Sequence, residues 1–147
     1  MHKLCSGWAL VLSLISFGFV PVSNAAGPSV SANDARALQL VVRAQLDAFA
    51  ADDAARAFSY ATPTIQTMFG TPEQFLLMVR STYPVVYRPA SVTFRKPTSD
   101  AAVLVQPVHM TDDNGGAWIA LYRLERQKDK SWRIAGCILV AESGKAV

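Results

Sequence analysis

The chain has 147 residues, of which 51% are hydrophobic and 17% charged, and its formal net charge at pH 7 is +3. A chain of this length builds one modest domain rather than two. The small basic excess is scattered along the chain, whereas nucleic-acid binding needs a like-signed patch with a much larger surplus. We therefore expect no nucleic-acid partner.

The first 25 residues have the layout of a cleaved secretory signal peptide. Lys3 precedes an apolar run over residues 8–20, and Ser23-Asn24-Ala25 supplies small residues for cleavage after Ala25. The run is shorter than the about 20 residues of a membrane-spanning helix, so cleavage is favoured over an uncleaved anchor. The sequence predicts an exported protein, periplasmic or secreted, with no stable membrane insertion after cleavage.

Cleavage would leave one cysteine, Cys137, and one histidine, His109. No internal disulfide could then form, and the apolar neighbours of Cys137 favour its burial as a small hydrophobe. We divide the rest of the chain into a flexible leader over residues 26–33, one domain over 34–141 and a tail over 142–147.

The domain opens with a helical pattern. Apolar residues recur every three or four positions from Leu38 to Phe49, which predicts an amphipathic helix capped by Asn33 or Asp34. Asp52-Asp53 marks a break before a shorter helix that runs through Tyr60. The first half of the domain is therefore expected to be helical.

Two further helix starts follow, each a threonine with proline at the first helical position. Thr62-Pro63 opens a short helix that ends at Gly70, and Thr71-Pro72-Glu73-Gln74 has the pattern of a capping box. The second helix must stop near Tyr83-Pro84, because the residue before a proline disfavours helical geometry.

The second half alternates with period two and predicts four strands. Their apolar positions fall in segments 92–94, 103–108, 118–124 and 132–138, and in the last of these Trp132, Ile134 and Ile138 are expected to share one face. Residues 113–116 contain the Asn-Gly pair of type I′ hairpins, and residues 128–131 form a second tight connection. Pro107 lacks an N–H, so its strand should be an edge there or carry a bulge.

Helices followed by an antiparallel meander predict an α+β domain with N-terminal helices packed on a curved four-stranded sheet. Gln45-Leu46-Asp47-Ala48-Phe49, the segment 83–89 and Ser131-Trp132-Arg133-Ile134-Ala135-Gly136-Cys137 resemble a family of bacterial exported proteins known only as a domain of unknown function. The resemblance covers about residues 35–139. The opening helix and final strand are more distantly similar to the nuclear transport factor 2-like (SnoaL-like, cystatin-like cone) superfamily. This implies a cone with a pocket, used by enzymes, ligand binders and association modules alike.

Catalysis in such a pocket would need a base and a hydrogen-bond donor for an oxyanion. His109 is the candidate base because histidine is the side chain suited to proton transfer near neutral pH, with Asp112 as its partner and Tyr60 or Tyr122 as the donor. The alternative is that His109 simply alternates out of the core. We favour that alternative, since no nucleophile or second acid is spaced to work with His109.

Two binding hypotheses also follow from the sequence. Tyr83, Tyr87 and Arg88 could form a rim that stacks a planar ligand or docks a partner, although a rigid connector is the favoured interpretation. Soft metal ligands are present in His109, Cys137 and the methionines, but methionines at apolar positions are usually core residues. We therefore expect no metal and no cofactor.

Our leading hypothesis is a noncatalytic exported domain that binds a small apolar ligand or a protein partner and forms a homodimer through the outer sheet face. The first alternative is a small pocket enzyme of the isomerase or cyclase type that uses His109. The second is a purely structural association module.

Overall fold

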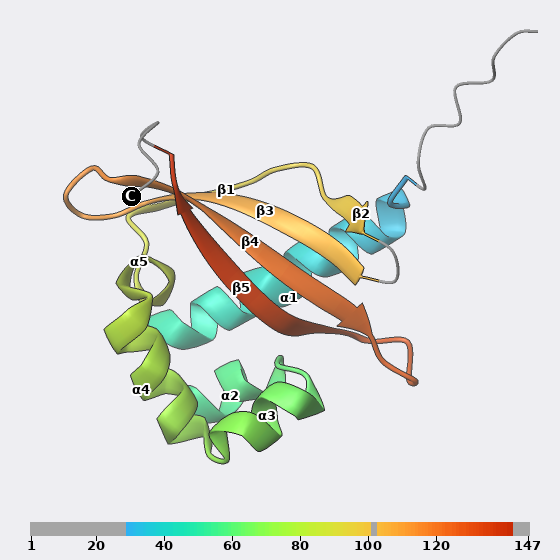
Figure 1. Cartoon of the computed structure of the whole chain (residues 1–147), viewed down its shortest axis with the longest axis horizontal. Coiled ribbons are helices and arrows are strands. Elements are labelled where there is room, and N and C mark those ends of the chain that lie inside the picture. The colour runs from blue at the N-terminus through green and yellow to red at the C-terminus, as the bar shows by residue number, and fades with distance from the viewer. Residues whose placement is uncertain (1–28, 101–102, 143–147) are drawn as a thin grey trace, which may run out of the picture.

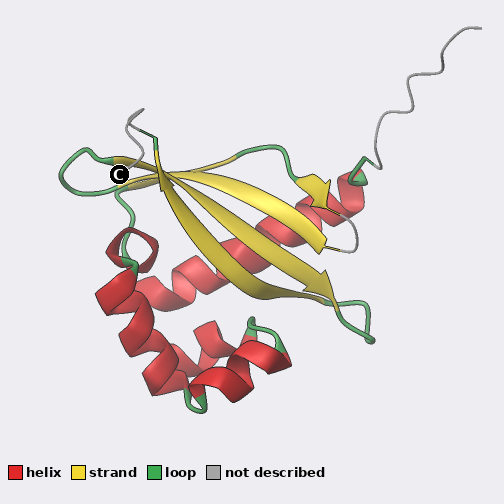
Figure 2. Ribbon diagram, viewed as in Figure 1, coloured by secondary structure: helices red, strands yellow, loops and turns green. Residues whose placement is uncertain are grey.

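The structure is a computed structural model and describes residues 29–100 and 103–142. Helices come first and an antiparallel sheet follows, which confirms the predicted α+β class (Figures 1 and 2). The elements are α1 Ala32–Ala50, α2 Ala54–Ser59, α3 Pro63–Phe69, α4 Pro72–Thr82, α5 Pro84–Tyr87, β1 Ser91–Phe94, β2 Thr98–Asp100, β3 Val103–Thr111, β4 Ala117–Arg126 and β5 Trp132–Ala141.

The expected signal peptide and its cleavage site lie outside the described residues. Within residues 29–100 and 103–142, no helix combines the length and the apolar composition needed to cross a membrane.

Helix α1 begins slightly earlier than the sequence suggested. Ser31 is its N-cap, and the Ser31 hydroxyl accepts a hydrogen bond from the backbone N–H of Asp34 at 3.1 Å. The prediction that Asn33 or Asp34 caps the helix was therefore wrong, because Ser31 already satisfies a free N–H of the first turn. The predicted apolar stripe is confirmed, since Leu38 and Val42 are fully buried.

The two threonine-proline helix starts are confirmed. Thr62 and Thr71 each accept a hydrogen bond from the backbone N–H three residues on, and proline occupies the first turn of α3 and α4. Gly70 ends α3 with a φ of 76°, a conformation that suits glycine. Helix α4 stops at Thr82 as expected, but Pro84 then starts the additional short helix α5.

The sheet has five strands rather than the predicted four. Its order is β1-β3-β4-β5, and the short β2 also pairs with β3, so two short strands share one side of β3. Pro107 lies at the break between them, where its carbonyl accepts a hydrogen bond from the N–H of Arg95 at 3.0 Å. The prediction of a local edge at Pro107 is thus confirmed, because its nitrogen faces an interrupted ladder.

Both hairpins close with the same turn, and it is not the type I′ turn that Asn114-Gly115 suggested. In the first hairpin Gly115 has a φ of 79° and donates its N–H to the carbonyl of Asp112 at 3.1 Å, while Asn114 keeps a negative φ. In the second, Lys130 takes the equivalent position with a φ of 68°. A type I turn followed by one left-handed residue gives this pattern. The side chain of Asp112 accepts the Asn114 N–H, which stabilises the type I form.

A β-bulge in β5 changes which residues face the helices. The β4–β5 register shifts between Arg123 and Leu124, so that Ala135 is an extra residue. Ile134 is consequently 5% exposed and Ile138 58% exposed, on opposite faces of the sheet. The prediction that these two residues share a face was wrong, because one inserted residue reverses the alternation.

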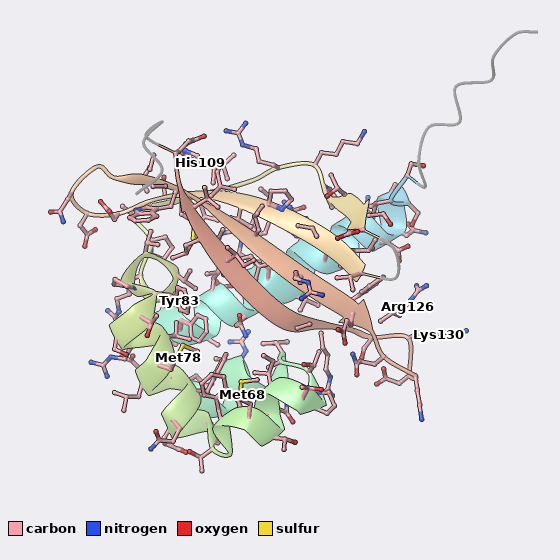
Figure 3. The ribbon with its side chains drawn as sticks, in the orientation of Figure 1. Met68, Met78, Tyr83, His109, Arg126 and Lys130 are labelled. Carbon is pink, nitrogen blue, oxygen red and sulfur yellow. The ribbon has the colours of Figure 1, made fainter. Side chains whose placement is uncertain are left out.

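The core lies between the helices and one face of the sheet, here called the inner face. Its strand residues are Val108, Met110, Ala120, Tyr122, Leu124 and Ile134. Trp118 and Trp132 are only half-buried and pack at the margins of this core. Arg126 stacks on the Trp132 ring and pairs with Asp34, which ties β4 to the start of α1 (Figure 3).

Two leucines on α1 test this assignment of faces. Leu38→Ala should lower the free energy of unfolding by about 2–5 kcal/mol, because it empties a fully buried site. Leu40→Ala is the matched control and should change it by less than about 0.5 kcal/mol, since Leu40 is 64% exposed. Urea denaturation measures both, and similar losses at the two positions would contradict the structure.

Candidate ligand-binding site

A cavity of about 240 Å³ lies between the inner face of β4 and β5 and the helices α1, α3 and α4. Met68 on α3, Met78 on α4 and Tyr83, which follows α4, lie on the side of these helices that faces β5 (Figure 3). Met68 is 69% exposed and therefore marks the open side of the cavity. The remaining lining comes from Gln45, Phe49, Ala61, Ile65, Phe69, Phe75, Val79, Val86, Tyr122, Ile134, Gly136 and Cys137.

The segment between α2 and α3 is attached to the edge of β5, and this fixes one end of the cavity. Ile134 donates its N–H to the carbonyl of Tyr60 at 2.8 Å, and Thr62 donates its N–H to the carbonyl of Ile134 at 2.9 Å. The Gln66 amide also donates to the carbonyls of Phe58 and Ala61, at 3.0 and 3.2 Å. Helix α3 is therefore held at a defined position beside the sheet.

Four phenylalanines connect the helices around the cavity. The ring of Phe75 on α4 lies 5.9 Å from Phe49, 5.4 Å from Phe58 and 5.5 Å from Phe69, measured between ring centroids. These residues come from α1, α2 and α3, so Phe75 brings all four helices together. Tilted and edge-to-face rings at such spacings attract one another beyond their buried area.

The amide of Gln45 joins α1 to α2 behind the cavity. Gln45 is 2% exposed, and its Nε2 donates to the carbonyl of Ala57 at 3.1 Å. One of the two N–H hydrogens of this amide is thus engaged within the protein.

Tyr122 and Cys137 supply polar groups from the sheet side. They face each other across β4 and β5, and both line the cavity. Tyr122 is 1% exposed, yet its hydroxyl has no hydrogen-bond partner among the described residues. The Cys137 thiol is near enough for the two groups to shift each other's pKa, but no well-formed hydrogen bond joins them. Such unpaired buried hydroxyls are rare in folded proteins.

Desolvation keeps both groups neutral, Tyr122 being fully buried and Cys137 half-buried. It raises the pKa of the Tyr122 phenol well above its usual value and raises the pKa of the Cys137 thiol to about 12. At pH 7 the cavity therefore presents a protonated phenol and a protonated thiol. None of its lining residues carries a charge.

His109 lies on the opposite, outer face of the sheet, between the buried Val108 and Met110 (Figure 3). Its Nε2 is 2.5 Å from a carboxylate oxygen of Glu142. Asp112, the expected partner of His109, instead accepts hydrogen bonds from the Trp118 indole and from the turn backbone, which lower its pKa. The structure therefore does not bring His109 together with Asp112 or Tyr122, and the arrangement expected for a pocket enzyme is not formed.

The predicted binding rim is divided between two roles. Tyr87 donates its hydroxyl to Asp52, and Arg88 pairs with the same carboxylate at 3.0 Å. These contacts lower the pKa of Asp52, chiefly through the Tyr87 hydrogen bond. Tyr87 and Arg88 thus tie α5 to the turn after α1, as a connector would, whereas Tyr83 lines the cavity.

Metal-ligating side chains are not grouped in the described part of the chain. No cluster of three or more His, Cys, Asp or Glu residues occurs there. His109 and Cys137 lie on opposite faces of the sheet, so these two soft ligands do not converge.

The sequence singled out Tyr122 only as an oxyanion donor for His109, and it gave no sign of the Phe75 cluster. The phenylalanines come from separate helices whose packing the sequence pattern does not specify. The one signal in the sequence was that Tyr122 and Cys137 lie on two consecutive predicted strands. In the structure these strands pair and place the two residues opposite each other.

The reactivity of Cys137 tests the burial of this site. Iodoacetamide should alkylate Cys137 roughly 100-fold more slowly than glutathione at pH 8, because a thiol with a pKa of about 12 carries very little thiolate. Mass spectrometry of the peptide that contains Cys137 measures the rate. Denaturant should restore fast labelling, and fast labelling of the folded protein would show that the thiol is exposed.

Comparison with known proteins gives one match. The model of a family described as a domain of unknown function (DUF4864) matches residues 31–147. No curated protein and no solved structure matches the chain. The predicted likeness to the nuclear transport factor 2-like superfamily stays a prediction.

Proposed function

Because the chain belongs to the DUF4864 family, whose description names no function, we propose from the site itself that the protein binds a small, largely apolar ligand in the cavity beside Tyr122. The observation that carries this proposal is the cavity's lining, which is almost entirely aliphatic and aromatic. Concave apolar sites with a few polar groups are the usual form of ligand pockets. The proposed activity is binding without chemical change.

The size of the cavity sets the size of the ligand. A cavity of about 150 Å³ accommodates benzene. By proportion, the 240 Å³ found here accommodates about ten non-hydrogen atoms. Metabolites with one ring or a short branched chain fit this size, whereas a nucleotide does not.

The place of action follows from the sequence alone. We infer export from the signal-peptide pattern of residues 1–25, so the ligand would be met outside the cytoplasm.

Occupation of the cavity can be tested with α-methylstyrene, an uncharged probe of nine carbon atoms. It should bind the wild-type protein, and Cys137→Phe should abolish binding because the added ring occupies the cavity. Isothermal titration calorimetry measures the affinity, and thermal unfolding checks that each variant is folded.

The matched control is Ile138→Phe, which adds a ring at the next residue but on the outer face, where Ile138 is 58% exposed. It should bind the probe like wild type. The proposal would be refuted if the wild-type protein did not bind α-methylstyrene, or if Cys137→Phe bound it as tightly as the wild type.

A second candidate function is self-association through the outer face of the sheet. Register places apolar residues of three neighbouring strands side by side on this face, and the helices gather on the other one (Figures 1 and 2). The patch comprises Pro107, Ile119, Leu121, Ile138 and Val140. Charges of both signs, Arg123 and Glu142, border it, which suits a two-fold contact between identical surfaces. Ile138 and Val140 are its exposed members, and exposed apolar patches mark interaction sites.

Ile138→Glu tests the self-association. Sedimentation should show a concentration-dependent dimer for the wild-type protein and a monomer for the variant, because a charge would be buried in the contact. Leu40→Glu, on an exposed position of α1, should leave the dimer intact. A wild-type protein that is monomeric at millimolar concentration would eliminate this candidate.

A further inference from the structure

We propose, on the basis of the proposed binding function, that the ligand is an uncharged carbonyl compound whose oxygen accepts a hydrogen bond from the Tyr122 hydroxyl inside the cavity. The ligand class is thereby narrowed from any small apolar molecule to compact ketones, aldehydes, esters or lactones of about ten non-hydrogen atoms.

The unpaired hydroxyl of Tyr122 is the first support. The Tyr122 side chain lines the cavity, and its buried hydroxyl has no hydrogen-bond partner among the described residues. Leaving a buried polar group unpaired costs free energy that a phenylalanine of nearly the same shape would not incur. A ligand oxygen placed in the cavity would remove this cost.

The absence of charge in the lining restricts the ligand further. A carboxylate or phosphate would lose its hydration on entering and would meet no cation among the lining residues. An ammonium group would meet no carboxylate there. The ligand's polar group must therefore be neutral.

The available hydrogen-bonding groups favour an acceptor on the ligand. The Nε2 of Gln45 donates one of its two hydrogens to Ala57, whereas the Tyr122 hydroxyl has no partner at all among the described residues. The neighbouring Cys137 thiol is a weak donor and stays protonated through burial. A carbonyl oxygen, with two lone pairs, can accept from the phenol while the rest of the ligand contacts only apolar side chains.

Three probes of nine non-hydrogen atoms separate the ligand classes. Acetophenone carries a neutral acceptor, α-methylstyrene replaces its oxygen by a CH₂ group, and benzoate carries a negative charge. Acetophenone should bind about tenfold more tightly than α-methylstyrene, and benzoate about 100-fold more weakly than acetophenone. Titration calorimetry at pH 7 gives all three affinities.

Tyr122→Phe identifies the donor. Because only the hydroxyl is lost, the variant should bind α-methylstyrene with the affinity of the wild type. It should bind acetophenone no more tightly than it binds α-methylstyrene. Its unfolding midpoint without ligand should equal or exceed that of the wild type. A clearly lowered midpoint would show that the hydroxyl has a partner in the free protein and would overturn the inference.

The remaining outcomes distinguish this inference from the function on which it rests. Equal affinities of wild type for acetophenone and α-methylstyrene, with both lost in Cys137→Phe, would refute the carbonyl class but keep the cavity as an apolar binding site. Tighter binding of benzoate would also refute the carbonyl class. Binding of none of the three probes would refute both.

Discussion

The structure depends on the need to cover the inner face of its sheet. A helix is about 10 Å across, whereas four strands spaced about 4.8 Å apart are nearly twice as wide. Helix α1 alone cannot bury this face, so the short helices α2, α3 and α4 must complete the cover beside β5. The backbone pairing of Tyr60 and Thr62 with Ile134 fixes where this second group of helices meets the sheet.

The cavity follows from how this cover is built. Phe75 joins α4 to α1, α2 and α3 through its ring contacts, so the short helices pack on one another as well as on the sheet. A space remains against β5, and Tyr122 and Cys137 face it. A fold selected for stability alone would place an apolar residue at position 122. The proposed ligand would give the buried hydroxyl there the partner that the core does not supply.

The sequence predicted the elements well because their signals are local. The hydroxyls of Thr62 and Thr71, each followed by proline, identified two helix starts, and period-two alternation identified the long strands. Prediction failed where distant residues decide the outcome. The bulge in β5 placed Ile138 on the outer face, and the partner of Tyr87 proved to be Asp52, in a turn 35 residues earlier. The cavity itself arises only from the packing of several elements, so no sequence motif could indicate it.

The most direct test of this account is a crystal structure of the protein under xenon pressure. Xenon enters dry apolar cavities without needing a specific hydrogen bond. We predict a xenon atom enclosed by Phe75, Ile134 and Cys137 next to the Tyr122 ring, with the side chains as described here. A structure without xenon at this place, in which the helices close onto β5 and the Tyr122 hydroxyl is bonded to a protein group, would contradict the existence of a ligand site.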